Sequence, residues 1–316
     1  MNANRSHCRL PSRLEAVDDV NVQRSGFTLV ELLVVMASVA ILAVTLLPGL
    51  AATWQNSQVV GCLANQRQLA VGWIMYARDN QDVLVPNRGL GGASGANYNG
   101  DPRLEPQLQP GGANADWCPG NLRNPGDTVP GLYPGGCKYS WWIQAGLLYP
   151  YINNISVYRC PADHSFVPGG GGPFTAPSPR TYSMNGWMQP MDAPGNQPAP
   201  WLGIHGYSAY TKLSDMARPG PGKIWVFIEE NPYSIDDAFF PLDPRETTTW
   251  YASPAVLHGN ASVLAFADGH TDARRWTDRN MITATPATPG GAAPNIPADP
   301  SSGDLAWLIS ASTVFE

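Results

Sequence analysis

The feature that most constrains the fold of this chain is a long apolar run close to its N-terminus. The run, FTLVELLVVMASVAILAVTLLPGLAA, covers residues 27–52 and contains a single charged residue, Glu31. A membrane-spanning helix needs about 20 apolar residues, whereas a secretory signal has an apolar region of only ~7–15, followed by its cleavage site. The length of the run therefore predicts a retained transmembrane helix that extends to about residue 52.

The distribution of basic residues around this run predicts an orientation. Four arginines lie in the polar segment 1–26, and the next basic residue after the run is Arg67. Basic residues concentrate on the cytoplasmic side of membrane helices. We therefore expect a single-pass protein with a cytoplasmic N-terminus and an extracytoplasmic C-terminal domain.

Composition limits the nature of the remaining chain. The 316 residues carry a formal net charge of −6 and no Lys/Arg-rich run, which argues against nucleic acid as a partner. Charged residues make up 14% of the chain, and there are 32 Gly and 31 Pro together with 11 Trp and 12 Tyr. This combination indicates a folded domain that is rich in loops.

The chain after the apolar run predicts an α+β fold. Apolar residues recur at roughly helical spacing through 54–80, so the first helix is expected to cover 27–80 and to be amphipathic after about residue 52. Residues 81–316 would form a globular head with long Gly/Pro-rich loops. Its predicted strands and terminal helix are Arg180–Met184, Lys223–Glu229, a hairpin of Ser262–Ala267 and His270–Trp276 around a type I′ turn at Asp268-Gly269, and helix Asp304–Ile309. One helix followed by strands suggests an antiparallel sheet packed on the long helix.

The segment RSGFTLVELLVV, residues 24–35, resembles the processing motif of the prepilin family, which comprises type IV pilins and type II secretion pseudopilins. The resemblance implies that 1–26 is a leader, that a prepilin peptidase cleaves after Gly26, and that Phe27 is then N-methylated. It also implies that Glu31 acts in assembly with other copies and related pilin subunits on an inner-membrane assembly platform. The localisation implied is the inner membrane, and a periplasmic or cell-surface filament after assembly.

The chemistry of Glu31 agrees with this role. A lone carboxylate at the centre of a bilayer costs ~2.5–3.5 kcal/mol, so such a residue usually has a partner. Cleavage after Gly26 would create a cationic amine at Phe27, which Glu31 of a neighbouring subunit can meet. We expect Glu31→Ala to leave cleavage intact and to abolish polymer formation.

Several segments further along the chain resemble a prepilin-like family, abundant in planctomycetes and verrucomicrobia, that carries an H-x₉-DG signature. Nine residues separate His258 from Asp268-Gly269 in HGNASVLAFADGH. The other segments that carry the resemblance are CLANQRQL (62–69), CPAD (160–163), YSMN (182–185) and FIEENPYSIDD (227–237). The likeness implies a shared architecture and no assigned biochemical activity.

The acidic and histidine residues of these segments are candidate metal ligands if they converge at one end of the sheet. The set is Glu229, Glu230, Asp236, Asp237, His258, Asp268 and His270. Carboxylates favour Ca²⁺, and an imidazole in the set would favour Zn²⁺ or another transition metal. Two other interpretations stay open, namely purely structural roles in turns and strands, and catalysis; no cofactor is certain.

The chain has five cysteines, of which Cys8 lies in the leader. An even number of four then remains, and two disulfides are the natural interpretation in an oxidising compartment. Three pairings exist, and we favour Cys118–Cys137 with Cys62–Cys160. Free buried thiols are the alternative, and a metal site made of cysteines is disfavoured because no C-x₂-C pair is present.

The sequence therefore predicts a non-enzymatic structural subunit of a type IV pilus or a type II secretion pseudopilus-like filament. The alternative is a membrane-anchored extracytoplasmic domain that binds a glycan or another ligand and uses a prepilin-like anchor.

Overall fold

The computed structural model describes residues 28–88, 112, 115–120, 122, 140–169, 172–191, 206–232, 234–284 and 295–315. The chain divides into two compact units, residues 1–51 and residues 52–316. The second unit therefore includes the C-terminal half of the first helix, whereas the sequence analysis began the head at residue 81. The predicted leader, with Gly26 and Phe27, lies outside the described residues.

Helix α1 runs from Leu29 to Asp79 and begins with a capping box. The Thr28 backbone N–H and hydroxyl donate to the Glu31 carboxylate at 2.9 and 2.8 Å, and the Glu31 N–H donates to the Thr28 hydroxyl at 3.3 Å. This reciprocal arrangement satisfies backbone donors that the first turn of a helix leaves unpaired. Glu31 therefore has a local structural role in the isolated chain.

The C-terminal half of α1 has one buried face. Cys62, Gln66, Leu69, Trp73 and Ala77 are all fully buried, and they are spaced three or four residues apart. This spacing places them on one stripe of the helix, as in an amphipathic helix that packs on a core. The sequence pattern in 54–80 predicted this behaviour.

A five-stranded sheet lies in the globular unit, in the order β10-β9-β6-β4-β7. The strands are β4 (Tyr182–Asn185), β6 (Trp225–Glu229), β7 (Phe239–Phe240), β9 (Ala261–Phe266) and β10 (Thr271–Arg275). Neighbouring strands are antiparallel except for β4 and β7, which are parallel. The α+β class agrees with the sequence analysis, but the sheet is mixed and not purely antiparallel.

The β9–β10 hairpin was predicted from Asp268-Gly269, but its turn differs from the one expected. The strands end at Phe266 and resume at Thr271, and only Gly269 of the Asp-Gly pair has a positive φ, at +90°. A type I′ turn requires positive φ at both central residues. The Asp268 side chain instead accepts from the His270 N–H at 3.0 Å, which stabilises a longer loop.

The remaining elements are short and surround the sheet. They comprise the strands β1 (Asn87–Arg88), β2 (Phe166–Gly169), β3 (Gly172–Pro177), β5 (Pro190–Met191), β8 (Thr249–Trp250) and β11 (Ile296–Pro297), the α-helices α2 (Ser140–Ala145), α3 (Tyr149–Ile152), α4 (Arg279–Thr283) and α5 (Asp304–Ser310), and the 3₁₀ helices η3 (Ile155–Tyr158), η4 (Leu213–Ala217) and η5 (Pro221–Lys223). Helix α5 matches the predicted terminal helix.

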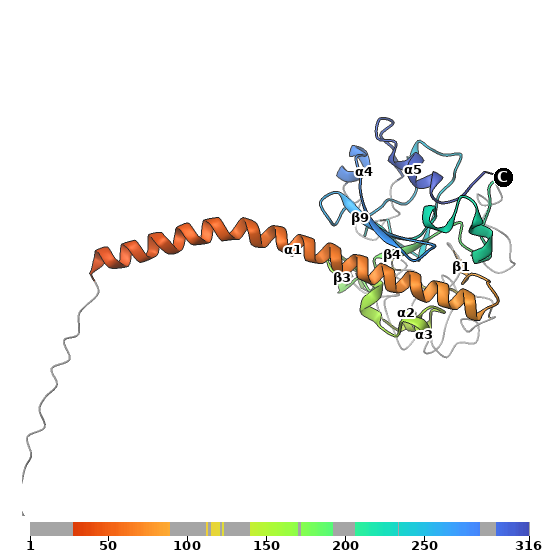
Figure 1. Ribbon diagram of the computed structural model, residues 1–316, viewed down its shortest axis with the longest axis horizontal. Coiled ribbons are helices and arrows are strands. Elements are labelled where there is room, and N and C mark those ends of the chain that lie inside the picture. The colour runs from red at the N-terminus through yellow and green to blue at the C-terminus, as the bar shows by residue number, and fades with distance from the viewer. Residues whose placement is uncertain are drawn as a thin grey trace, which may run out of the picture. The chain divides into compact units, whose positions relative to one another are not determined.

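Within the globular unit, α1 lies between the sheet and the α2–α3 segment (Figure 1). On the sheet side, the Gln66 amide donates to the Val263 carbonyl on β9 at 2.7 Å. On the other side, Asn65 donates to the Arg159 carbonyl at 3.0 Å, and Gly72 is so close to α3 that a Cβ there would lie 2.5 Å from Ile152 Cδ1. Both sides of α1 are thus fastened to the head.

The sheet is covered on both faces. Val263 and Ala265 of β9 belong to the core that contains α1, and the alternating Leu264 and Phe266 belong to a second core with Trp225 and the apolar side of α5. This alternation follows the two-residue period of a strand. A site where α1 meets β6 and β9 is therefore deep inside the unit.

The structure does not support the predicted transmembrane helix. Among the described residues, none of the helices combines the length and apolar character that crossing a bilayer requires. From Ser57 onward α1 is amphipathic. The prediction of a membrane-spanning helix was therefore wrong, and so was the inner-membrane single-pass localisation derived from it.

Candidate functional site

Four side chains with metal-binding chemistry meet where α1 crosses the sheet. They are Cys62 on α1, Cys160 in the loop after η3, Glu229 at the end of β6 and His258 in the loop before β9, and their ligand atoms all lie within 4.8 Å of one another. We call these four residues the Cys-His-Glu cluster. Cys62 and Glu229 are fully buried, and the His258 side chain is 2% exposed.

Hydrogen bonds connect the members of the cluster. Glu229 Oε1 lies 2.5 Å from Cys62 Sγ and 3.0 Å from His258 Nε2, and Cys160 Sγ lies 3.3 Å from the same His258 nitrogen. The sulfur, nitrogen and oxygen atoms of the cluster thus face one another around a common centre. None of the four side chains of the cluster is directed at solvent.

Groups outside the cluster fix the orientation of its members. The Val263 N–H donates to Glu229 Oε2 at 2.7 Å, and the Ala162 N–H donates to Cys160 Sγ at 3.3 Å. The Tyr182 hydroxyl lies 3.0 Å from Cys62 Sγ. These contacts hold one carboxylate oxygen and both sulfurs in place while the other carboxylate oxygen faces the interior of the cluster.

Local sequence explains how α1 reaches the cluster. Gly61 precedes Cys62, and a Cβ at that position would lie 3.2 Å from the Cγ of Pro161, the residue after Cys160. Most real Cβ contacts are longer than this, so a glycine allows the helix to approach the Cys160 loop closely. The two cysteines are brought together by this contact.

Burial and charge set the protonation of the cluster. Burial raises the pKa of the Cys62 thiol well above its usual range, with further contributions from Cys160 and Glu229. Burial alone would lower the pKa of His258, but hydrogen bonds to Cys160 and Glu229 outweigh it and raise the pKa to about 10. In the metal-free chain, His258 therefore forms a buried ion pair with Glu229.

The predicted metal ligands separate into three places. Glu229 and His258 belong to the Cys-His-Glu cluster. Asp268 and His270 form an exposed pair on the β9–β10 loop, with 2.5 Å between Oδ1 and Nδ1, and the His270 ring stacks on Phe266. Glu230, Asp236 and Asp237 lie beyond the end of β6. Within the described part of the chain, the predicted convergence of all these groups at one cation site is therefore not observed.

The acidic group after β6 is held by Arg180. Its guanidinium donates to the backbone carbonyls of Asp236 and Asp237, at 3.0 and 2.6 Å, and not to their carboxylates. Glu230 is buried and accepts from the Ser234 hydroxyl at 2.8 Å, and burial raises its pKa to about 8. Loss of hydration, and then the charge of Asp236, raise the pKa of Asp237 well above its usual range. Burial therefore favours the protonated forms of Glu230 and Asp237 within this group.

Replacement of Glu230 by glutamine is expected to remove a pH-dependent loss of stability. The folded chain holds the Glu230 proton up to about pH 8, whereas the unfolded chain releases it near pH 4.5. The wild-type head should therefore lose stability as pH rises from about 4.5 to about 8, by at most ~1.4 kcal/mol per pH unit from this group. Glu230→Gln should flatten this dependence, measured as urea unfolding at pH 5 and pH 8.

The control for that measurement is Asp272→Asn, an exposed position on β10. It should show the same pH dependence as the wild type. Equal slopes for Glu230→Gln and the wild type would contradict a buried protonated Glu230.

The cysteines are described as free thiols. Cys62, Cys118 and Cys160 are all buried and unpaired with another cysteine, and Cys137 lies outside the described residues. The predicted Cys62–Cys160 disulfide is therefore not formed, although both cysteines lie in the Cys-His-Glu cluster, and the predicted Cys118–Cys137 pair lies partly outside the described residues. The structure gives them a histidine and a glutamate as neighbours in place of the disulfide.

The sequence analysis singled out all four residues of the cluster, but it did not predict that they lie together. The absence of a C-x₂-C pair argued against cysteine ligands, because that spacing places two sulfurs on one local turn. Here each ligand comes from a different segment. The signal was available, since all four belong to segments that carry the resemblance to the H-x₉-DG family.

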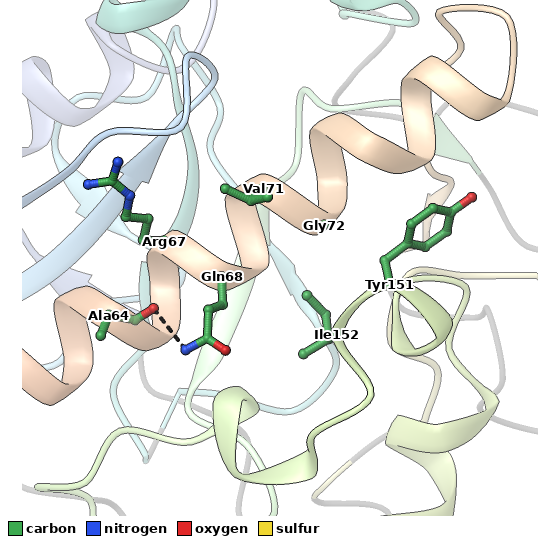
Figure 2. A pocket seen from close by; sticks show the side chains of 7 residues that line it. All are labelled: Ala64, Arg67, Gln68, Val71, Gly72, Tyr151 and Ile152. Carbon is green, nitrogen blue, oxygen red and sulfur yellow. Dashed lines mark hydrogen bonds between the residues drawn. The ribbon is translucent and has the colours of Figure 1, made fainter.

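A groove with a volume of about 400 Å³ lies on the opposite side of α1 from the sheet (Figure 2). Ala64, Gln68 and Val71 line it from α1, and Tyr151 and Ile152 line it from α3. Gly72 also lines the groove, next to Ile152. The groove is open and contains no cluster of titratable groups, so it does not compete with the Cys-His-Glu cluster as a chemical site.

Comparisons with protein-family models, curated proteins and solved structures give no match for this chain.

Proposed function

We propose that this chain is a prepilin-type structural subunit that polymerises through the N-terminal part of α1. The observation that carries the proposal is the contrast between the two halves of this helix. Large apolar side chains such as Leu29, Leu33 and Met36 are more than half exposed in the first half, whereas the second half forms the core of a globular unit.

An exposed apolar helix of this kind needs a covering surface. Soluble monomers rarely expose contiguous apolar patches larger than a few hundred Å². Copies of the same helix supply such a cover, because packed apolar helices bury each other's side chains. Glu31 is the one charged residue in this apolar stretch, and a copy-to-copy contact would pair it with the amine created at Phe27 by cleavage after Gly26.

The head supports the same role. The two main hydrophobic cores cover both faces of the sheet. Within the described residues, the titratable groups of the Cys-His-Glu cluster are buried and do not reach solvent. A nucleophile or base that substrate cannot reach does not favour catalysis. A globular head that follows a polymerising helix in the chain fits a structural subunit, which interacts with a prepilin peptidase, an assembly platform and copies of itself.

The test is the state of the native protein in its own cells. We expect mass spectrometry to find a mature chain that begins with N-methylated Phe27, and immunogold electron microscopy to find it in filaments sheared from the cells. A native chain that begins upstream of Phe27, or a processed chain absent from every polymer, would contradict the proposal.

A further inference from the structure

The Cys-His-Glu cluster presents a complete donor set for one metal ion. It supplies two thiol sulfurs, one imidazole nitrogen and one carboxylate oxygen. Sulfur and nitrogen donors select Zn²⁺ over Ca²⁺ and Mg²⁺, which prefer oxygen alone. The chemistry of the donors therefore points to a thiophilic divalent cation.

The spacing of the donors fits tetrahedral coordination. Ligand atoms bound to Zn²⁺ at 2.0–2.3 Å lie about 3.3–3.8 Å apart at the corners of a tetrahedron. Here Cys160 Sγ and His258 Nε2 are 3.3 Å apart, His258 Nε2 and Glu229 Oε1 are 3.0 Å apart, and no two donors are separated by more than 4.8 Å. Cys62 Sγ and Glu229 Oε1 are 2.5 Å apart, so this pair would have to separate by about 1 Å around the ion. Small shifts of the side chains would admit the ion at the centre.

Outer contacts orient the donors as in metal sites. The Val263 N–H holds one carboxylate oxygen of Glu229 and leaves Oε1 toward the centre, while the Ala162 N–H contacts the Cys160 sulfur. Hydrogen bonds from neighbouring groups to the ligand side chains fix the orientation of these ligands, and they are typical of metal centres. Four protein donors fill a tetrahedron, which is the arrangement of a structural site and not of a catalytic one.

A disulfide between Cys62 and Cys160 explains less of the cluster. It would use the two sulfurs and leave His258 and Glu229 paired only with each other, and a buried ion pair gains little net stability because both charges lose their hydration. A metal ion uses all four groups together. We propose that the Cys-His-Glu cluster is a structural Zn²⁺ site that fastens α1 to the sheet and to the Cys160 loop.

The test uses the full-length chain, purified without chelator or reductant. We expect about one zinc per chain by elemental analysis, and a lower melting temperature after chelation that added Zn²⁺ restores. Replacement of Zn²⁺ by Co²⁺ should give the visible bands of tetrahedral cobalt with thiolate-to-metal charge transfer. The cobalt spectrum is measured on the wild type, so it does not depend on a variant that folds.

Variants locate the ion. Cys62→Ser and His258→Asn should lose the stoichiometric zinc, whereas Cys118→Ser, at a buried cysteine outside the cluster, should keep it. Zinc retained equally by Cys62→Ser, a cobalt spectrum without charge transfer, or a Cys62–Cys160 disulfide found by non-reducing peptide mapping would overturn the proposal. These outcomes are independent of whether the chain forms filaments.

Discussion

Replacement of His258 by alanine is expected to destabilise the head by roughly 3–5 kcal/mol, because it leaves the Glu229 carboxylate buried without a cation. Glu229 is fully buried, and within the described residues His258 is the basic side chain that pairs with it. A domain of this size is stable by only ~5–15 kcal/mol, so the variant should lose a large fraction of its folding free energy. Urea unfolding in a buffer with chelator measures the ion pair apart from any metal.

The chain offers a matched control in its second histidine–carboxylate pair. His270 and Asp268 are 46% and 42% exposed, so His270→Ala should cost only ~0–1 kcal/mol, as for other surface pairs. Addition of Glu229→Gln to His258→Ala should recover part of the loss, since the neutral amide keeps an oxygen for the Val263 N–H. Equal, small effects of His258→Ala and His270→Ala would contradict a buried ion pair.

Local patterns predicted most of the elements that form the sheet and its helices. The apolar run KIWVFIE contains the central strand β6, the Asp-Gly hairpin corresponds to β9 and β10, and DLAWLI forms most of α5. Each depends on side-chain periodicity or turn chemistry within a few residues. The β2–β3 hairpin was missed because its Gly/Pro-rich sequence has the composition of a loop, and the parallel β4–β7 pairing was missed because it depends on packing between distant segments.

For the Cys-His-Glu cluster, local sequence patterns predict even less than they do for the fold. Its residues stand out in sequence, but their grouping requires the topology that brings Cys62, Cys160 and His258 to one point from separations of about 100 residues. The expectation that the acidic and histidine residues converge at one end of the sheet wrongly joined His258 to Asp268. In the fold, β9 carries the two to different places.

Replacement of Glu31 is expected to abolish filament formation without preventing cleavage after Gly26. The expected loss follows from the proposed contact between Glu31 and the amine of a neighbouring Phe27. Breaking a buried pair of this kind costs about 3 kcal/mol or more, or ~100-fold in each subunit contact, and a polymer repeats that loss at every step. Electron microscopy of sheared material, with mass spectrometry of the chain termini, measures assembly and processing separately.

The capping box at the start of α1 requires a more discriminating set of variants than alanine alone. Glu31→Ala removes both the charge and the bonds from Thr28, whereas Glu31→Gln keeps an oxygen acceptor for Thr28 and removes only the charge. Thr28→Val removes the hydroxyl and leaves the charge, and its cost is limited to the ~0.5–2 kcal/mol of a helix cap. We expect no filaments from Glu31→Ala or Glu31→Gln and near-normal filaments from Thr28→Val. Normal filaments from Glu31→Gln would show that Glu31 acts as a helix cap and not as the charged contact between subunits.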